Sequence, residues 1–506
     1  MVSKLLLNTS HACRPSLTSC LGLLVVVACI LYSFAGCTIS RSDSLHIHGF
    51  SNASLSGKYT YALAGLSLAS TGNNPYQESG VFVADGKGNL TGGVDDIVQP
   101  GGSTSNTVSG TYHIASDGTG MMTLNGTRQV QLAVTIVSAS RVYLVEYDGA
   151  GNGSGIAVIE GGSASTPTGT YVVHTHSSNF NSGFQSSTSM VGALTFSGTS
   201  INGSADLLQA GALSAVSITG TLTPPDENGR GTINITNSVG NATAYIYYLI
   251  DSTAFNLLET DTINFGGGHA EAQTGAPYTN ASLSGAFSFR SQGDTLTHNS
   301  GVNSIGAFTS DGSSNVTGGS YDSAQDGVPT LKAPVTGGYS LASNGRATID
   351  LTPQGAAPVN QIAWMVSPSR FFFLVNASDR VEDGTADQQV SGPFSASSVK
   401  GQYAFYMYGY NQNAFVRIDR IGTIVFDDSQ TTIAFTNYYL NRGGALTQIG
   451  AQGVAYTADP DGRIFASPSG VSNALIVYLT SPTSGYFILG DSGLEISGKL
   501  EQQVVP

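Results

Sequence analysis

Apolar and polar residues alternate with a period of two along most of the chain. Tyr59, Tyr61 and Leu63 alternate with smaller or polar residues, and residues 286–290 and 402–407 repeat this alternation. A period of two places one face of a strand on a core and the other on water. Asp-Gly, Asn-Gly and Gly-Asn pairs separate the alternating stretches and supply the positive φ that tight hairpins need. No stretch shows helical periodicity, so the pattern predicts an all-β protein.

The chain repeats itself four times, at intervals of about 114 residues. Residues 52–57 (NASLSG) recur letter for letter at 280–285, and residues 82–93 recur in altered form at 308–319. Two fainter copies lie at half this spacing. All four copies are visible in the turns at 117–119, 228–230, 344–346 and 461–463, which read DGT, NGR, NGR and DGR. We therefore predict four β repeats, of which the first and third are the most similar.

Each repeat contains about eight strands joined by short connections, which implies antiparallel pairing of neighbours. In the first repeat the strands are expected to start near Gly57, Ser79, Leu90, Val108, Met121, Gln129, Arg141 and Gly155. Such a meander can close into an up-and-down barrel, which removes exposed edges, or it can form a β-sandwich. The expected fold is thus four tandem antiparallel meander domains, barrel-like or, alternatively, sandwich-like.

The N-terminal residues predict an export signal. Lys4 and Arg14 make the start basic, residues 21–31 are apolar, and two small residues precede Cys37. Such a segment describes a secretory signal, and its apolar run is shorter than a membrane-spanning helix needs. The end of the run resembles the lipobox of bacterial lipoproteins, which implies a lipid on Cys37, although Phe34 stands where that family prefers leucine. An ordinary cleaved signal and an uncleaved anchor are the alternatives.

These patterns divide the chain into a signal, a tether and four repeats. The predicted limits are 1–36 for the signal peptide, 37–53 for the tether, and 54–162, 163–274, 275–392 and 393–506 for the four β repeats. All four cysteines precede the repeats, which therefore contain no thiol for disulfides, metal binding or nucleophilic chemistry. The repeats must be stable through their cores alone.

The formal net charge of the chain is −14, and only 10% of its residues are charged. An acidic surface argues against nucleic acid as a partner. Gly, Ser, Thr and Asn take the place of charged residues, a composition common in extracellular β-proteins. Composition is thus compatible with an exported protein and disfavours nucleic acid as a partner.

The repeat motifs resemble those of predicted lipoproteins from soil acidobacteria, in which G-x-Y-x-F, F-x-A-D-G-x-G-N-x-T-G-G and D-G-R-G-T recur in tandem. Here they lie at 57–61, 82–93 and 117–120, and the resemblance covers nearly the whole mature chain, although repeats two and four depart from it. The Gly-x-aromatic strand and the Asp-Gly hairpin are also faintly similar to lipocalin and avidin barrels. The resemblance implies a lipoprotein but no activity. Because Thr38 follows the cysteine in place of an inner-membrane retention aspartate, we expect the outer membrane or cell surface, with a soluble extracellular protein as the alternative.

Two loop motifs suggest chemistry, and a turn explains each of them better. Residues 490–493 (GDSG) spell the nucleophile motif of trypsin-like proteases, but Leu494 follows in place of a second glycine. Residues 85–89 (DGKGN), like Asp95 and Asp96, carry side chains that suit calcium. Neither group follows the spacing of an EF-hand, and a hairpin accounts for residues 85–89. We predict turns and no metal site.

Two carboxylate pairs are spaced like the acid and base of a glycosidase. They are Glu146 with Asp148 and Glu259 with Asp261, and spacing two on a strand puts both members on one face. The sequence alignment places Asn376 and Gly490 at the glutamate position in repeats three and four. Because an active site does not require such copying whereas a strand end does, we favour a structural role and predict no catalytic residue.

Two histidine pairs, His46 with His48 and His174 with His176, can each point two imidazoles from one side of an extended segment. Two ligands are too few for a closed zinc site, and no third is evident. We therefore expect surface histidines and no cofactor. Trp364 lies in an apolar run and is expected in the core.

These observations favour a non-catalytic, membrane-tethered or secreted surface protein with a binding or spacer role. The alternative is a secreted hydrolase with a site between repeats. The expected partners are the membrane, through the lipid anchor, and polysaccharides or another surface protein. Five tyrosines of repeat four either stack on sugars or pack within the sheets: Tyr406, Tyr408, Tyr410, Tyr438 and Tyr439.

Overall fold

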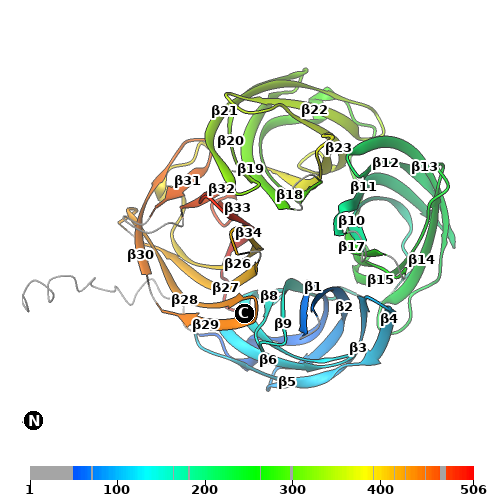
Figure 1. Ribbon diagram of the computed structural model, residues 1–506, viewed down its shortest axis with the longest axis vertical. Helices are drawn as coiled ribbons and strands as arrows, with labels where there is room; N and C mark the ends of the chain where they lie inside the picture. Colours follow the sequence, from blue (N-terminus) through cyan, green and yellow to red (C-terminus); the bar gives the residue numbers. More distant parts are fainter. Residues whose placement is uncertain are drawn as a thin grey trace, which may run out of the picture. The chain divides into compact units, whose positions relative to one another are not determined.

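The computed structural model describes residues 49–506, apart from residues 70–71, 163–164, 180–182, 262–263, 297–299, 391, 415, 428, 451 and 468–473. The signal peptide, Cys37, and the pair His46 and His48 therefore lie outside the described residues. The described chain forms four closed antiparallel β-barrels (Figure 1). The all-β prediction is confirmed, and closure of each sheet excludes the β-sandwich.

Each barrel is an up-and-down meander in which sequential strands pair and the last strand returns to the first. Barrel 1 consists of β1(Ser56–Ala69), β2(Gly72–Asp85), β3(Asn89–Gln99), β4(Gly102–Thr107), β5(Ser109–Ile114), β6(Thr119–Asn125), β7(Gln129–Ser138), β8(Arg141–Glu146) and β9(Gly151–Ile159). Barrel 2 consists of β10(Gly169–Asn179), β11(Gly183–Ser197), β12(Ser200–Gln209), β13(Ala212–Leu222), β14(Arg230–Asn237), β15(Ala242–Asp251), β16(Ala254–Glu259) and β17(Asn264–Ala272).

Barrel 3 consists of β18(Ser284–Thr295), β19(Ser300–Asp311), β20(Asn315–Gln325), β21(Val328–Leu341), β22(Arg346–Pro353), β23(Val359–Ser367), β24(Arg370–Val375) and β25(Arg380–Gln388). Barrel 4 consists of β26(Gly401–Asn411), β27(Val416–Phe426), β28(Thr432–Arg442), β29(Ala445–Ile449), β30(Gln452–Ala458), β31(Arg463–Ala466), β32(Leu475–Ser481), β33(Ser484–Leu489) and β34(Leu494–Gln502). One-turn 3-10 helices precede the first strand of barrels 1, 3 and 4: η2(Asn52–Ser54), η3(Asn280–Ser282) and η4(Ala396–Ser398).

Barrels 1 and 4 have one strand more because their fourth strand is divided. β4 and β5 both pair with β3, and β29 and β30 both pair with β28, whereas the single strands β13 and β21 take this place in barrels 2 and 3. The starts expected near Gly57, Leu90, Gln129 and Arg141 agree with the structure within one residue. The second strand begins at Gly72 and not near Ser79, because β1 and β2 continue as a long hairpin beyond the alternating stretch.

Each barrel has its own core, built by the inward residues of its strands. In barrel 1, Tyr59, Tyr61 and Leu63 point inward from β1 and are buried. The ring of Tyr59 stacks on Phe82 of β2, with centroids 5.4 Å apart. Burial of such a side chain contributes about 1.5–3 kcal/mol. Equivalent clusters fill the other three barrels.

Outward residues join the barrels in a closed cycle of contacts. Val81 and Val98 of barrel 1 pack with Ile246 and Tyr248 of barrel 2 in a buried cluster. Similar clusters join barrel 2 to barrel 3, barrel 3 to barrel 4, and barrel 4 to barrel 1. Each barrel therefore contacts two others within one compact unit of the described chain.

Candidate functional site

Three of the four contacts between barrels contain the same ion pair, which we call the arginine clasp. In each, the arginine that ends the NGR or DGR turn of one barrel donates from Nε and Nη2 to both carboxylate oxygens of an aspartate in the preceding barrel. The clasps are Arg230 with Asp96, Arg346 with Asp206, and Arg463 with Asp322, with N–O distances of 2.7 to 3.0 Å. An aromatic donor reaches the same aspartate in each case: Tyr248, Trp364 or Tyr478. Bidentate pairing of this kind fixes the geometry between the two barrels.

The clasps correct the expected place of Trp364 and show what Asp96 binds. Trp364 is buried, but it lies between barrels 2 and 3 and not in a barrel core, and its Nε1 donates to Asp206 at 2.9 Å. Asp96 belongs to a clasp. Both carboxylate oxygens of Asp95 accept from the main-chain amide of Thr127, each at 3.0 Å. Protein donors thus occupy the oxygens that a calcium ion would need.

The contact between barrels 4 and 1 is built without an arginine clasp. The strand register places Thr119 at the arginine position and Tyr439 at the aspartate position. Arg141 of barrel 1 pairs with Glu501 of barrel 4 at 3.0 Å, and the hydroxyl of Tyr143 donates to the same carboxylate at 2.5 Å. This contact is the one that closes the cycle.

The segment after the last strand of each barrel crosses to the next barrel. Four equivalent main-chain bonds mark these crossings, at 2.7 to 2.8 Å: Gly161 to Ile250, Thr274 to Val366, Val390 to Thr480, and Val504 to Val137. The fourth bond brings the segment after β34 back to barrel 1. Gln503 accompanies it, donating from Nε2 to the carbonyl of Ile136 at 2.6 Å and accepting from Gln402 at 2.5 Å.

His174 and His176 project from β10 toward barrel 3. His174 Nε2 and His176 Nδ1 each lie 2.6 Å from an oxygen of Asp383, and His176 Nε2 lies 3.2 Å from Asp294. The two histidine side chains are 21% and 31% exposed and bond to carboxylates of barrel 3, so they are partly buried interface residues and not the freely exposed histidines expected. Among the described residues, no group of three or more metal-ligating side chains is arranged to hold an ion.

The charges of this cluster support one another. Burial alone would lower the pKa of His176, but Asp383 and Asp294 outweigh it and raise that pKa well above its usual range. Burial would raise the pKa of Asp383, but the two histidines lower it. Ser187 donates to Asp294 at 2.6 Å and not to a histidine, so the cluster lacks the serine–imidazole pair that activates a nucleophile.

We predict that this contact loses stability at high pH through His176. Because the folded pKa of His176 is raised, its contribution is complete below the unfolded value of about 6.5 and is lost as the pH rises through the folded value. The lowered pKa of Asp383 adds a loss at acidic pH, below about 3.9. Thermal midpoints of wild type and His176→Gln from pH about 5 to about 10 test this. Parallel pH curves for the two proteins would contradict it.

The first predicted carboxylate pair lies at one end of barrel 1. Glu146 is fully buried, pairs with Arg128 at 2.6 Å and accepts from the hydroxyl of Tyr76 at 2.5 Å. Arg128 also pairs with Glu78 at 2.9 Å. Asp148 lies in the hairpin that follows, where it accepts a main-chain amide. This placement agrees with a role at a strand end.

Glu259 takes the register position of Glu146 in barrel 2. Burial, with Asp261 beside it, raises the pKa of Glu259 to about 8, so this carboxyl is largely protonated at neutral pH. Barrels 3 and 4 have Val375 and Leu489 at this position, and Asn376 and Gly490 follow one residue later. The alignment of these two residues with Glu146 was therefore wrong by one position, which in a strand moves a side chain to the opposite face.

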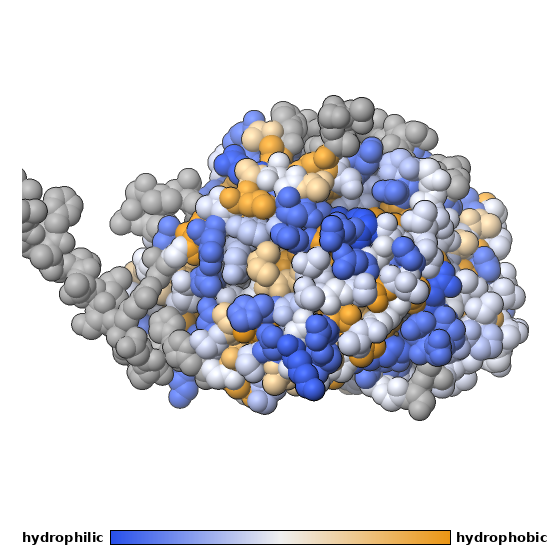
Figure 2. Space-filling view, turned by 90° about the horizontal axis from the view of Figure 1, so that it is seen from below, coloured by the Kyte–Doolittle hydropathy of each residue, from blue (hydrophilic) through white to orange (hydrophobic). Residues whose placement is uncertain are grey.

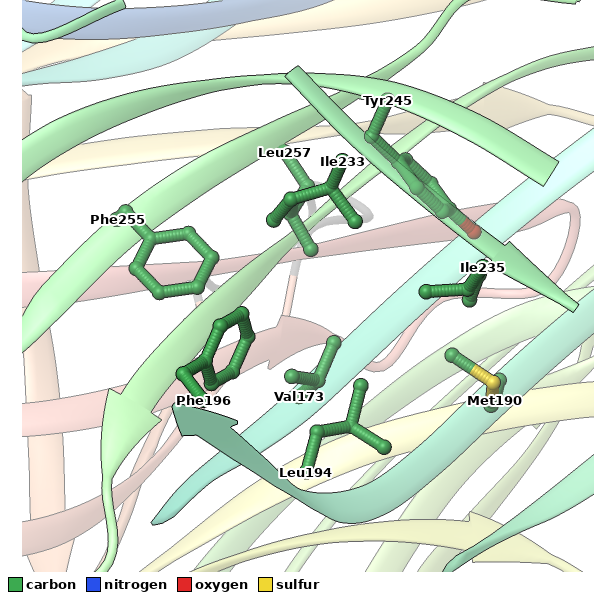
Figure 3. A pocket seen from close by; sticks show the side chains of 9 residues that line it. All are labelled: Val173, Met190, Leu194, Phe196, Ile233, Ile235, Tyr245, Phe255 and Leu257. Atoms are coloured by element: carbon green, nitrogen blue, oxygen red, sulfur yellow. The ribbon is translucent and has the colours of Figure 1, made fainter. Parts of the chain in front are cut away.

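A small apolar cavity lies inside barrel 2 (Figure 3). It is lined by Val173, Met190, Leu194, Phe196, Ile233, Ile235, Tyr245, Phe255 and Leu257. The cavity offers a volume of about 10 Å³ to the centre of a water molecule, which is room for about one water, so side chains fill this barrel and leave no room for a carried ligand.

The remaining motifs have structural roles. Residues 490–493 form the turn between β33 and β34, and the amide of Gly493 donates to the carbonyl of Gly327 in barrel 3 at 2.7 Å. Asp85 accepts the amides of Lys87 and Asn89 in the predicted hairpin. The turn interpretation of both motifs is confirmed.

The five tyrosines of barrel 4 pack against protein. Tyr438 is 8% exposed in the core of barrel 4, and Tyr406 is 7% exposed against Tyr143 of barrel 1. Tyr439 meets Tyr147 of barrel 1 edge to face. The guanidinium groups of Arg290 and Arg417 lie 5.3 and 5.5 Å from the ring of Tyr408, and Tyr410 is half-buried. Of the two alternatives for these residues, packing is correct.

No helix among the described residues is both long enough and apolar enough to span a bilayer.

No protein-family model and no curated protein matches the chain. Among solved structures, the chain is similar to the isotype 1 transferrin binding protein B from serogroup B Neisseria meningitidis. The identity is 9% and the TM-score 0.17, over 73% of this chain and 84% of that chain. A likeness at this level carries no argument about function.

Proposed function

We propose that this chain is a non-catalytic protein of the bacterial cell envelope that uses four joined barrels as one rigid body for binding or for spacing. The observation that supports this is the closed cycle of contacts, in which buried apolar clusters join every barrel to two others. Three of the contacts also contain an arginine clasp. Independent domains on flexible linkers would not bury the clasp aspartates between them, because burying a charge is costly unless its partner is fixed.

The proposed address is the outer membrane or the cell surface, through a lipid on Cys37, with a soluble extracellular protein as the alternative. The apolar run that ends just before Cys37 supports this. Cells labelled with a palmitate analogue should incorporate the label into the wild-type protein and not into Cys37→Ala. Equal labelling of both proteins would contradict the proposal.

The proposed partners are polysaccharides or another surface protein, bound through polar loops. Figure 2 shows one face of the molecule, on which hydrophilic and hydrophobic residues are interspersed. Because the tyrosines of barrel 4 pack against protein, they no longer support stacking on sugars. The acidic charge of −14 disfavours nucleic acid.

The alternative of a hydrolase with a site between repeats would place its chemistry at His174 and His176. Both histidines are held by carboxylates of barrel 3, and Ser187 is bonded to Asp294. The two carboxylates raise the pKa of His176, and an imidazole held in its protonated form cannot accept the proton of a nucleophile. This arrangement favours a structural role for the cluster.

A soluble protein spanning residues 38–506 tests the proposal on a glycan array and on esterase, glycosidase and peptidase substrates. Binding without turnover is the expected result. Turnover that a single change such as Ser187→Ala or Glu146→Gln abolishes would contradict the proposal. If the protein shows neither glycan binding nor turnover, only the spacer role remains.

A further inference from the structure

The fourth strand of barrel 2 has an open edge along its first half. β13 pairs with β12 over residues 212–221, but with β14 only over residues 218–222. Residues 212–217 therefore have a strand on one side and, among the described residues, none on the other. In Figure 1, β13 lies on the side of barrel 2 away from β10 and β17. An open edge of this kind is a template for the addition of a further strand.

The turn before this edge determines which main-chain groups face the open side. Residues 210 and 211 both have positive φ, at 45° and 77°, and form a two-residue hairpin loop. The residues that flank such a loop bond to each other, so the even-numbered residues of β13 face β12. The N–H and C=O groups of Leu213 and Ala215 then point to the open side. Among the described residues, none bonds to these four groups.

The edge is uncharged and is flanked by an exposed apolar side chain. Ser217 ends it, because its N–H donates to Ser238 Oγ at 3.2 Å and its C=O accepts from the N–H of Ser238 at 2.9 Å. Val239 follows Ser238 and is 58% exposed. Neither residues 212–217 nor residues 237–241 include a charged residue or a proline. Nothing in these two segments therefore opposes the approach of another strand.

The corresponding edge of barrel 3 is blocked. In β21, Pro329 takes the position of Leu213, and Lys332 and Pro334 follow it. The pairing of β21 with β20 also shifts in register there. Prolines, lysines and bulges are the means by which proteins prevent their edge strands from pairing. Barrel 2 has none of them at this edge.

The edges of the other two barrels differ from that of β13 in composition or in description. β4 of barrel 1 is open in the same way, but its residues 102–107 (GSTSNT) carry only small polar side chains. Pairing at β4 would bury little apolar surface, whereas β13 supplies leucine, alanine and valine. β29 of barrel 4 leads toward residue 451, which lies outside the described residues. The edge of β13 is thus the one with both open groups and apolar side chains.

We propose that a second copy of this chain adds to β13 at this edge, antiparallel and about a two-fold axis through Ser214. In this register Leu213 of each copy lies opposite Ala215 of the other, so the four free groups of one copy bond to the four of the other. The uncharged edge lets two chains, each with a formal net charge of −14, meet without like charges placed opposite each other. A strand pair of this length buries less than a permanent dimer interface, so the association is reversible.

Sedimentation equilibrium of the soluble protein spanning residues 38–506 tests this pairing. We expect a concentration-dependent equilibrium between monomer and dimer. Ala215→Pro removes an N–H that faces the open side and leaves the bonds to β12 in place, so it should weaken the dimer by about tenfold or more. Ser214→Lys places two lysines opposite each other at the two-fold axis and should weaken the dimer by about as much. Both residues are exposed in the single chain, so neither change reaches the barrel core.

An equimolar mixture of Ser214→Lys and Ser214→Asp proteins should recover the dimer, because lysine then lies opposite aspartate. Thr104→Lys is the matched control. Thr104 is exposed and takes the position of Ser214 in β4, so the same change of charge there should leave the dimer within about threefold of wild type.

A wild-type protein that stays monomeric at every concentration would overturn the proposal. So would Ala215→Pro or Ser214→Lys proteins that associate like wild type, or an equal weakening by Thr104→Lys. A mixture of the lysine and aspartate variants that stays monomeric would overturn the two-fold register. The proposal goes beyond the binding or spacer role, and none of these outcomes measures glycan binding or turnover, so the two proposals can fail separately.

Discussion

Replacing Asp322 with alanine is expected to lower the free energy of unfolding by about 3–5 kcal/mol. Asp322 is fully buried between barrels 3 and 4 and accepts from Nε and Nη2 of Arg463 at 2.8 Å each. It also accepts from the hydroxyl of Tyr478 at 2.7 Å. Without the carboxylate, a guanidinium whose side chain is 5% exposed would lose its counter-charge. Urea denaturation and the thermal midpoint measure the loss.

A second change separates this charge effect from lost packing. Arg463→Met in the Asp322→Ala background should recover most of the stability, because both charged partners are then replaced by apolar side chains. Asp85→Ala, in an exposed hairpin, is the control and should cost much less. An Asp322→Ala protein as stable as Asp85→Ala, or a double variant no more stable than Asp322→Ala alone, would contradict the role of the clasp.

The period of two was sufficient to predict the strands and their order. Tyr59, Tyr61 and Leu63 lie inward on β1 because a half-buried strand must place every second residue on its core. The Asp-Gly and Asn-Gly turns then limit the connections to hairpins, so that neighbouring strands pair. Closure into a barrel was one of two solutions compatible with this pattern, and pairing of the last strand with the first settled it.

The arginine clasps show what local pattern does not contain. The turn repeat displayed their arginines, but Arg230 lies 134 positions from Asp96, and Arg463 lies 141 positions from Asp322. Periodicity indicates which residues share a face of one strand, but it does not predict which barrels contact each other. A signal was nevertheless present, because the repeat without the aspartate, at Tyr439, and the repeat without the arginine, at Thr119, are the two that meet.

The outward residues of barrel 4 and barrel 2 illustrate the same limit. Tyr406, Tyr408 and Tyr410 share one face of β26, and His174 and His176 share one face of β10, as their spacing predicts. An outward face was expected to meet water. Here it meets another barrel, so residues that suggested a sugar platform or surface histidines are interface residues.

A second set of ion pairs relates alternate barrels. Arg141 at the start of β8 pairs with Glu501 in the last strand of barrel 4, and Arg370 at the start of β24 pairs with Glu271 in the last strand of barrel 2. Barrels 1 and 3 thus each supply the arginine of such a pair, and barrels 2 and 4 each supply the glutamate. This pattern, together with the closer similarity of repeats one and three, favours an origin in a duplicated two-repeat block.

The contact between barrels 4 and 1 is expected to be the most sensitive to a single change, because it has no arginine clasp and its barrels are not consecutive in the chain. Gln503 is 3% exposed in this contact. Gln503→Ala removes the side-chain donor to the carbonyl of Ile136 and one of the two acceptors of the Gln402 amide, which keeps its bond to the carbonyl of Asp117, at a total cost of about 1–3 kcal/mol.

Hydrogen exchange and small-angle scattering measure whether this loss separates the two barrels. Gln389→Ala is the matched control, because Gln389 makes the equivalent bonds to the carbonyls of Asp461 and Leu479 between barrels 3 and 4. There the chain connection and the Asp322 clasp still hold the barrels together. We expect Gln503→Ala to accelerate amide exchange in β7 next to Val137 and to increase the radius of gyration, and Gln389→Ala to change the radius little. Equal changes in both variants, or none in Gln503→Ala, would show that the apolar cluster between barrels 4 and 1 is enough to keep the cycle closed.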